Sequence, residues 1–224
     1  MSNGGDDYLV MYTVQGIFDA SSQVFSESQT MNPSILLAAV LALPVLGASA
    51  AHATGMEPAW VNDARSVAAA MPPKLMQTLT AAIQQSGPAG AIGSCREEAP
   101  KMARAASEQS GWQIRRVSLK NRNPKAVPDD WERQALESFE RSQAAGADAS
   151  QLERWDTVTE NGQSVRRYMR ALPTQAMCLQ CHGKAEDLGA GVAQRLGQLY
   201  PDDHATGYSV GQIRGAMTLR QAVR

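Results

Sequence analysis

The sequence predicts an α+β fold, with helices first and an antiparallel sheet later in the chain. Apolar residues recur at helical spacing between Pro58 and Gln85. Two strand-like segments flank Asn161-Gly162, a dipeptide typical of tight hairpin turns because both residues tolerate positive φ. The chain lacks the regular strand-helix-strand alternation that builds parallel sheets.

The N-terminal part contains one apolar run, Ile35 to Leu46, followed by small residues that form two Ala-x-Ala cleavage sites. A run of this length is too short to span a bilayer and is typical of a secretory signal peptide. We therefore predict an N-terminal extension over residues 1–30, a signal peptide over 31–53 and a single exported domain over 54–224. The predicted location is the periplasm. A buried helix or an uncleaved anchor is the alternative for the apolar run.

A helical hairpin is expected to begin the domain. Its first helix covers Pro58 to Gln85, and Pro72-Pro73 should divide that helix into two pieces. The segment from Gly87 to Gly90 is expected to form a turn. A further helix should run from Cys95 to Ser110 and end at Gly111.

The remaining elements are one helix and four strands. A strand is expected over Trp112–Leu119, followed by a polar loop over 120–128 and a helix from Pro128 to Gly146 whose buried stripe is Trp131, Ala135, Leu136 and Phe139. The hairpin strands are 152–159 and 164–172, and a last strand covers 215–223.

Composition and charge exclude few classes of function. The chain is 43% hydrophobic and 19% charged, which is ordinary for a globular domain, and its formal net charge is -1. A net charge this small does not favour a nucleic-acid partner or an anionic membrane surface. With the signal peptide removed, we expect no stable membrane span.

The motif Cys178-Leu-Gln-Cys181-His182 has the C-x-x-C-H spacing of a c-type haem attachment site. Two thiols at this spacing can add to the vinyl groups of one haem, and the adjacent histidine becomes an axial ligand of the iron. A thioredoxin-type redox pair, a Cys₃His zinc site that includes Cys95, and a Cys178–Cys181 disulfide are the alternatives.

Cys95 is left over once two thioethers form. It is either a buried free thiol or a thiolate ligand on the face of the iron opposite His182, because haem iron accepts cysteine axially. Other residues that could bind the iron there are His204, Met177, Met102 and Met169.

The chain resembles a family of exported proteins with a PAS-like fold and one covalently attached c-type haem. The resemblance rests on an ordered series of segments: Ala91–Cys95 with Ala99-Pro100, Gly111-Trp112, Arg115–Pro124, Pro128–Glu132, Cys178–Gly183, Tyr200–Tyr208 and Gly211–Ala216. It implies a PAS-like antiparallel sheet with flanking helices, and Cys95 as the second axial ligand with His182. His182 and Cys95 would then both bind the haem iron.

Arginines near the start of the predicted sheet suggest further contacts. Arg115, Arg116 or Arg122 could pair with the haem propionates, because guanidinium groups bind carboxylates bidentately; a solvated basic loop is the alternative. Trp112 and Tyr208 are expected in the core rather than against haem.

We expect a non-enzymatic haem domain that senses redox state or a small gaseous ligand and passes its signal to a partner protein. A periplasmic one-electron carrier and a structural zinc-binding domain are the alternatives. A peroxidase would need an open distal position with an acid/base group, for which His204 is the plausible residue.

Overall fold

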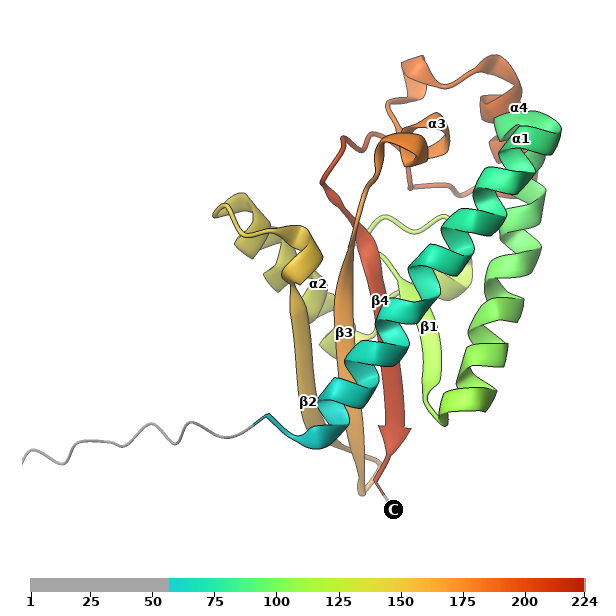
Figure 1. Cartoon of the computed structure of the whole chain (residues 1–224). Coiled ribbons are helices and arrows are strands. Elements are labelled where there is room, and N and C mark those ends of the chain that lie inside the picture. The colour runs from blue at the N-terminus through green and yellow to red at the C-terminus, as the bar shows by residue number, and fades with distance from the viewer. Residues whose placement is uncertain (1–56, 224) are drawn as a thin grey trace, which may run out of the picture. The chain divides into compact units, whose positions relative to one another are not determined.

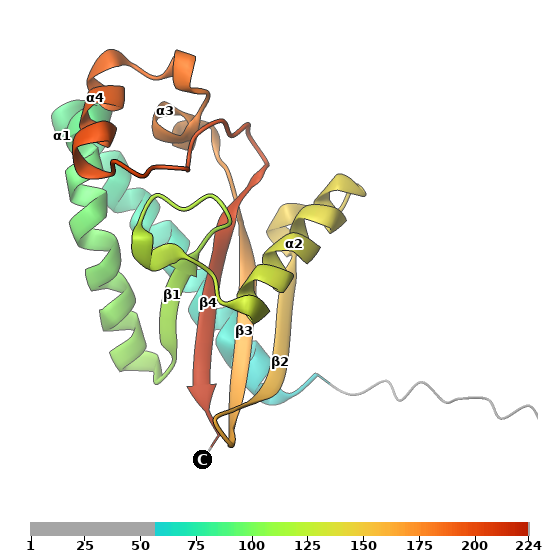
Figure 2. The same cartoon turned by 180° about the vertical axis from the view of Figure 1, so that it is seen from behind.

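The computed structural model describes residues 57–223. The predicted N-terminal extension, the signal peptide and its cleavage sites lie outside these residues. Figures 1 and 2 show the described part as a four-stranded sheet with helices on both faces, which confirms the α+β prediction. No helix within residues 57–223 has both the length and the apolar character needed to cross a bilayer.

Helix α1, Ala59–Ser110, forms the predicted hairpin, with Gly87 at its tip. Gly87 has φ 68°, a left-handed conformation that glycine adopts without steric cost, and the chain reverses there into a second arm (Figure 1). The second arm begins directly after Gly87, and not near Cys95 as predicted. Pro88 fits this place because the first residue of a helix needs no intrahelical N–H bond.

The predicted break at Pro72-Pro73 is wrong. The first arm stays helical through both prolines, although each removes a backbone hydrogen bond. Ala68 and Met71, in the helical turn before them, are buried against the sheet. Tertiary packing holds the helix together where local propensity would interrupt it.

The sheet has the order β1-β4-β3-β2, with every neighbouring pair antiparallel. Its strands are close to those predicted: β1 Gln113–Val117, β2 Glu153–Glu160, β3 Gln163–Pro173 and β4 Ile213–Ala222. Asn161 and Gly162 form the two-residue turn between β2 and β3, with φ of 51° and 78°. These positive values confirm the hairpin prediction.

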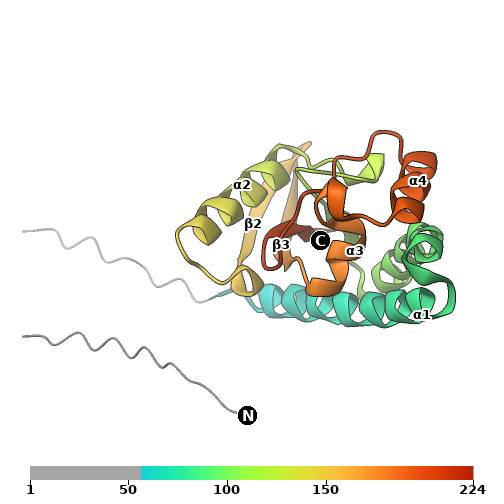
Figure 3. The ribbon, with the colours of Figure 1, turned by 90° about the horizontal axis from the view of Figure 1, so that it is seen from above.

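Helices α1 and α2 cover opposite faces of the sheet (Figure 3), and each face has its own core. On one face, the first arm of α1 packs on Trp112, Ile114 and Tyr168. On the other face lies α2, Asp130–Ala144, whose residues Ala135, Leu136 and Phe139 are buried as predicted. Trp131 is only half-buried.

Helix α2 begins with a capping box. The Asp129 carboxylate accepts a hydrogen bond from the Glu132 N–H, and the Glu132 side chain accepts one from the Asp129 N–H. Both bonds satisfy backbone donors that the first helical turn leaves free. The Glu132 side chain in the first turn therefore has a structural role at the start of the helix.

The tip of the α1 hairpin lies beside two short helices from late in the chain, α3 (Leu179–His182) and α4 (Ala190–Leu199), as Figure 1 shows. Ile92 of α1 packs against Val192 and Leu196 of α4 in a third, smaller core. The sequence analysis did not predict α4. Four 3₁₀ turns complete the fold: Pro124–Ala126, Ala149–Gln151, Ala176–Cys178 and Ala185–Asp187.

Candidate functional site

A cavity of about 630 Å³ lies between the α1 hairpin, strand β1 with the loop that follows it, and α3. Its volume is in the range of cofactor and ligand sites in proteins. All four residues that the sequence singled out, Cys95, Cys178, Cys181 and His182, line it. Cys95 comes from the second arm of α1 and the other three from the segment around α3, so two distant parts of the chain meet here.

The two arms of α1 supply an apolar wall. The first arm contributes large side chains at four-residue intervals: Met71, Leu75, Leu79 and Ile83. The second arm contributes small ones at the same interval: Ala91, Cys95, Ala99, Ala103 and Ser107. Residues four apart share one helix face, so the second arm presents a flat surface in which Cys95 is the single side chain that binds metals well.

The attachment motif lies on the single turn of α3 and the 3₁₀ turn before it. Gly183 ends this turn, and its N–H donates to the Leu179 carbonyl oxygen at 2.9 Å. A Cβ at position 183 would lie 2.6 Å from that oxygen, a distance that a side chain cannot adopt. The glycine after His182 is therefore required by the local backbone.

The His182 ring is oriented by backbone. Its Nδ1 lies 2.7 Å from the Ala205 carbonyl oxygen and 3.2 Å from Arg214 Nε. A carbonyl oxygen can only accept, so Nδ1 carries the hydrogen and donates it to Ala205, and the Arg214 contact is not a hydrogen bond to this tautomer. Nε2 is then the unprotonated nitrogen, the arrangement that metal-binding histidines use.

The carbonyl that holds His182 is itself fixed by a buried ion pair. Arg122 and Asp203 lie 2.9 Å apart, each with 11% of its side chain exposed. Asp203 also accepts a hydrogen bond from the Ala205 N–H at 2.8 Å, and Arg122 donates to the Cys181 carbonyl oxygen at 2.6 Å. One arginine thus ties the loop that contains Ala205 to the attachment motif.

Charge and burial keep the site's metal-binding groups neutral in the protein alone. Burial, followed by the Arg214 and Arg122 charges, lowers the pKa of His182 well below its usual range. Burial raises the pKa of the Cys95 thiol, with a smaller contribution from Cys181. A neutral imidazole can bind a metal without losing a proton, whereas a thiol must lose its proton to do so.

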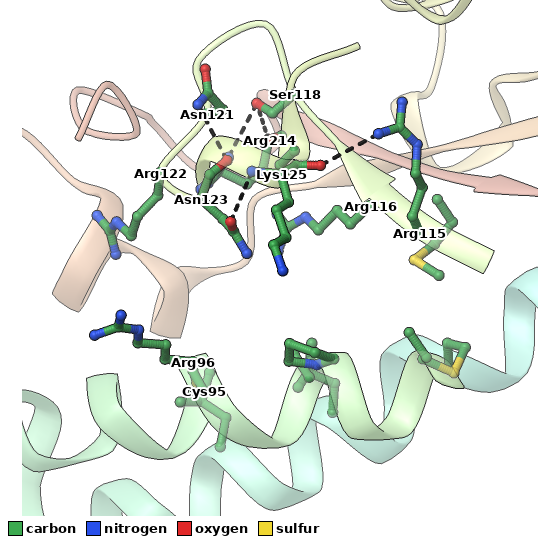
Figure 4. A pocket seen from close by; sticks show the side chains of 18 of the residues that line it. Cys95, Arg96, Arg115, Arg116, Ser118, Asn121, Arg122, Asn123, Lys125 and Arg214 are labelled. Carbon is green, nitrogen blue, oxygen red and sulfur yellow. Dashed lines mark hydrogen bonds between the residues drawn. The ribbon is translucent and has the colours of Figure 1, made fainter. Parts of the chain in front are cut away.

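The cavity is strongly basic, above all on the side that faces the apolar wall. Seven of its lining residues are basic and one, Glu108, is acidic; the basic residues are Arg96, Arg104, Arg115, Arg116, Arg122, Lys125 and Arg214. Figure 4 shows Arg116, Arg122 and Lys125 across the cavity from Cys95. Burial, followed by the charge of Arg116, lowers the pKa of Arg214 to about 9. Such an excess of cations favours an anionic occupant.

This geometry fits haem. A flat apolar surface, a basic side for carboxylates, two thiols three residues apart and a histidine with free Nε2 are groups that suit a covalently attached haem. Cys95 lines the same cavity from the second arm of α1, a part of the chain distant from the C-x-x-C-H motif.

Several alternatives from the sequence lose support. All three cysteines are free thiols, so Cys178 and Cys181 do not form a disulfide. Between residues 57 and 223, no group of three or more His, Cys, Asp or Glu side chains is arranged to hold a metal ion, so the Cys₃His zinc set is not assembled.

The other residues considered as iron ligands occupy different places. His204 is exposed and does not line the cavity. Met169 is buried in the core under α2, and Met102 packs against the core under α1. Met177 does line the cavity. Of the two aromatic residues expected in the core, Trp112 and Tyr208 are both buried, and the Tyr208 ring also contacts the His182 ring edge-on at 6.5 Å.

Three functional residues escaped the sequence analysis: Asp203, Ala205 and Arg214. Ala205 acts through its backbone carbonyl, which no residue pattern identifies. Asp203 and Arg214 belong to segments that were quoted for the family resemblance, but nothing in their sequence showed that they converge on His182.

Comparisons with known proteins agree with this geometry. A family model described as Tll0287-like matches residues 17–222. Among solved structures, the crystal structure of the cyanobacterial haem protein Tll0287 is similar, with a TM-score of 0.54 and 25% sequence identity over 75% of this chain and 98% of that chain. No curated protein gives a significant match. Because the family model covers most of the sequence, this chain belongs to the Tll0287-like family.

Proposed function

We propose that the chain is a mono-haem c-type cytochrome domain, with haem attached through Cys178 and Cys181 and its iron bound by His182 and Cys95. The observation that carries the proposal is the His182 ring, whose Nδ1 is held by the Ala205 carbonyl so that Nε2 remains for iron. The haem-protein relative and the match to its family support the same cofactor. When bound, haem supplies a one-electron couple at its iron.

The residues around the cavity have distinct tasks in this proposal. Cys178 and Cys181 fix the position of the porphyrin, and Ala205 sets the tautomer and direction of the His182 ring. The large apolar side chains of the first α1 arm exclude water from one side of the ring. Cys95 would donate strongly to the iron, which stabilises the ferric state and lowers the reduction potential.

Covalent attachment is tested directly. Protein produced with cytochrome-maturation machinery should be coloured, should exceed the polypeptide mass by one haem, and should give a c-type pyridine haemochrome spectrum. The Cys178→Ser/Cys181→Ser variant should carry no covalent haem. A colourless wild-type protein, or one with stoichiometric zinc, would refute the proposal. The same mass shows whether the chain is cut after Ala50 or Ala53, as export to the periplasm requires.

The axial ligands are tested by spectroscopy of the ferric protein. We expect a low-spin thiolate signature in electron paramagnetic resonance that disappears in Cys95→Ser. His204→Ala is the matched control, because His204 is exposed and away from the cavity. A spectrum unchanged by Cys95→Ser would remove Cys95 from the iron.

We further propose that the domain senses redox state or a small gaseous ligand through a change at the Cys95 position. A thiolate on the iron is exchangeable, and the apolar cavity wall beside Cys95 suits an uncharged diatomic molecule. Carbon monoxide should therefore bind the ferrous protein. A reversible one-electron couple without ligand uptake would instead indicate the electron carrier.

A further inference from the structure

Three arginines from one stretch of sequence lie around the cavity, and they differ in what they bind. Arg115 and Arg116 are neighbours on β1, and adjacent residues of a strand point to opposite faces of the sheet. Arg115 points to the α2 face, where it pairs with the buried carboxylate of Glu132 and donates to the Val127 carbonyl oxygen. Its guanidinium is therefore already paired with an anion.

The Arg122 guanidinium also has partners within the protein. Its guanidinium forms the buried pair with Asp203 and donates to the carbonyl oxygens of Cys181 and Ala205. These bonds hold the loop and the attachment motif in place, so releasing Arg122 to another anion would dismantle the support of His182.

Arg116 differs from both. It points to the α1 face, as Ile114 two residues earlier does, and it lines the cavity. Within residues 57–223, its guanidinium has neither a salt bridge nor a hydrogen-bond partner. Burial lowers its pKa, because a guanidinium removed from water loses hydration of its charge. A half-buried guanidinium without a counter-ion is costly unless an anion occupies the space it faces.

Figure 4 shows Arg116 on the basic side of the cavity, across from the α1 arm with Cys95. The α1 arms supply mainly apolar side chains, and Arg116 belongs to the opposite, basic side. An occupant that lies against both surfaces must be apolar over most of its area and carry anionic groups at one edge.

We propose that Arg116, rather than Arg115 or Arg122, binds a propionate carboxylate of haem and thereby sets which edge of the porphyrin enters the cavity. The inference rests on the proposed function and identifies the anchoring residue. The planar guanidinium fork matches a carboxylate with two parallel hydrogen bonds, a contact that lysine cannot reproduce.

The test separates the carboxylates from the rest of the porphyrin. In full-length Cys178→Ser/Cys181→Ser protein, haem binds without thioethers, so its affinity can be titrated with haemin and with haemin dimethyl ester, which lacks both negative charges. We expect haemin to bind about tenfold or more tightly than the ester, as a charge-assisted hydrogen bond requires. Adding Arg116→Met should remove most of that preference, and Arg116→Lys should restore only part of it.

Arg154→Met is the matched control. Arg154 lies over the Trp131 ring and away from the cavity, so this variant should keep the full preference for haemin. If Arg116→Met keeps it too while still binding haemin, the inference is wrong and the proposed haem site stands. If the Cys178→Ser/Cys181→Ser protein binds no haemin and the matured wild type is colourless, the proposed function itself fails. Circular dichroism confirms that each variant is folded.

Discussion

Removing the Asp203 carboxylate should destabilise the protein more than any exposed substitution nearby. In Asp203→Ala, the Arg122 guanidinium, whose side chain is 11% exposed in the wild type, loses its counter-ion, and the Ala205 N–H loses its acceptor. Breaking one partner of a buried ion pair costs about 3–5 kcal/mol. Arg122 keeps its bonds to the carbonyl oxygens of Cys181 and Ala205, so we expect a loss near the lower limit, about 3 kcal/mol.

Thermal unfolding of the haem-free protein, followed by far-ultraviolet circular dichroism, measures this loss without a contribution from ligand binding. For a chain of this size, about 3 kcal/mol corresponds to a midpoint lower by about 6–12 °C. Asp202→Ala is the control, because Asp202 is exposed and its side chain bonds to no described residue; its midpoint should shift by less than about 2 °C. Equal midpoints for the two variants would show that the ion pair does not stabilise the loop.

Three further predictions concern the attachment turn, the pH dependence and the core. Gly183→Ala should destabilise the protein by about 1–3 kcal/mol in urea titrations because its Cβ meets a backbone oxygen at 2.6 Å. The control is Gly197→Ala, inside α4 with open space around it, which should be neutral or slightly stabilising. The hydrogen bond from Arg65 holds the pKa of Glu153 below its usual 4.5. The ionised Glu153 carboxylate therefore stabilises the fold fully above pH 4.5, and this stabilisation disappears as pH falls through the lower folded-state pKa. The free energy of unfolding of Glu153→Gln should fall less steeply below pH 4.5 than that of the wild type. Leu136→Ala, at a position 1% exposed, should cost about 2–5 kcal/mol in the same titrations, and a loss below 1 kcal/mol would contradict the assignment of the core under α2.

Local chemistry explains why much of the fold could be predicted. The Asn161-Gly162 turn has positive φ at both residues, which few other dipeptides accept, so its sequence fixes a two-residue hairpin. The start of α2 was predicted within two residues, because acidic side chains gather in its first turn.

The errors in the fold arose where tertiary packing outweighs local preference. Pro72-Pro73 should interrupt an isolated helix, yet burial of Ala68 and Met71 against the sheet keeps α1 helical. Helix α4 was not predicted at all. Its buried side chains, Val192 and Leu196, are too few to give a clear periodic pattern and depend on α1 for a surface to pack on.

The features of the site also fall into those that the residue pattern predicts and those that depend on the tertiary fold. Cys178, Cys181 and His182 were identified from spacing alone, because the geometry of thioether attachment is local in sequence. That Cys95 lines the same cavity depends on how the α1 hairpin packs on the sheet, and the residue pattern left its role open. The direction of the His182 ring depends on the Ala205 carbonyl, and a backbone atom leaves no trace in residue identity.

The small side chains of the second α1 arm leave space for the cavity, and this space affects the stability of the protein. They are Ala91, Cys95, Ala99, Ala103 and Ser107. Exchanging Ala99 or Ala103 for leucine would add methyl and methylene groups to the interior and remove apolar surface from water, which favours the folded state. The same groups would take the space that a bound molecule needs. At these positions a gain in the stability of the protein alone therefore comes with a smaller cavity.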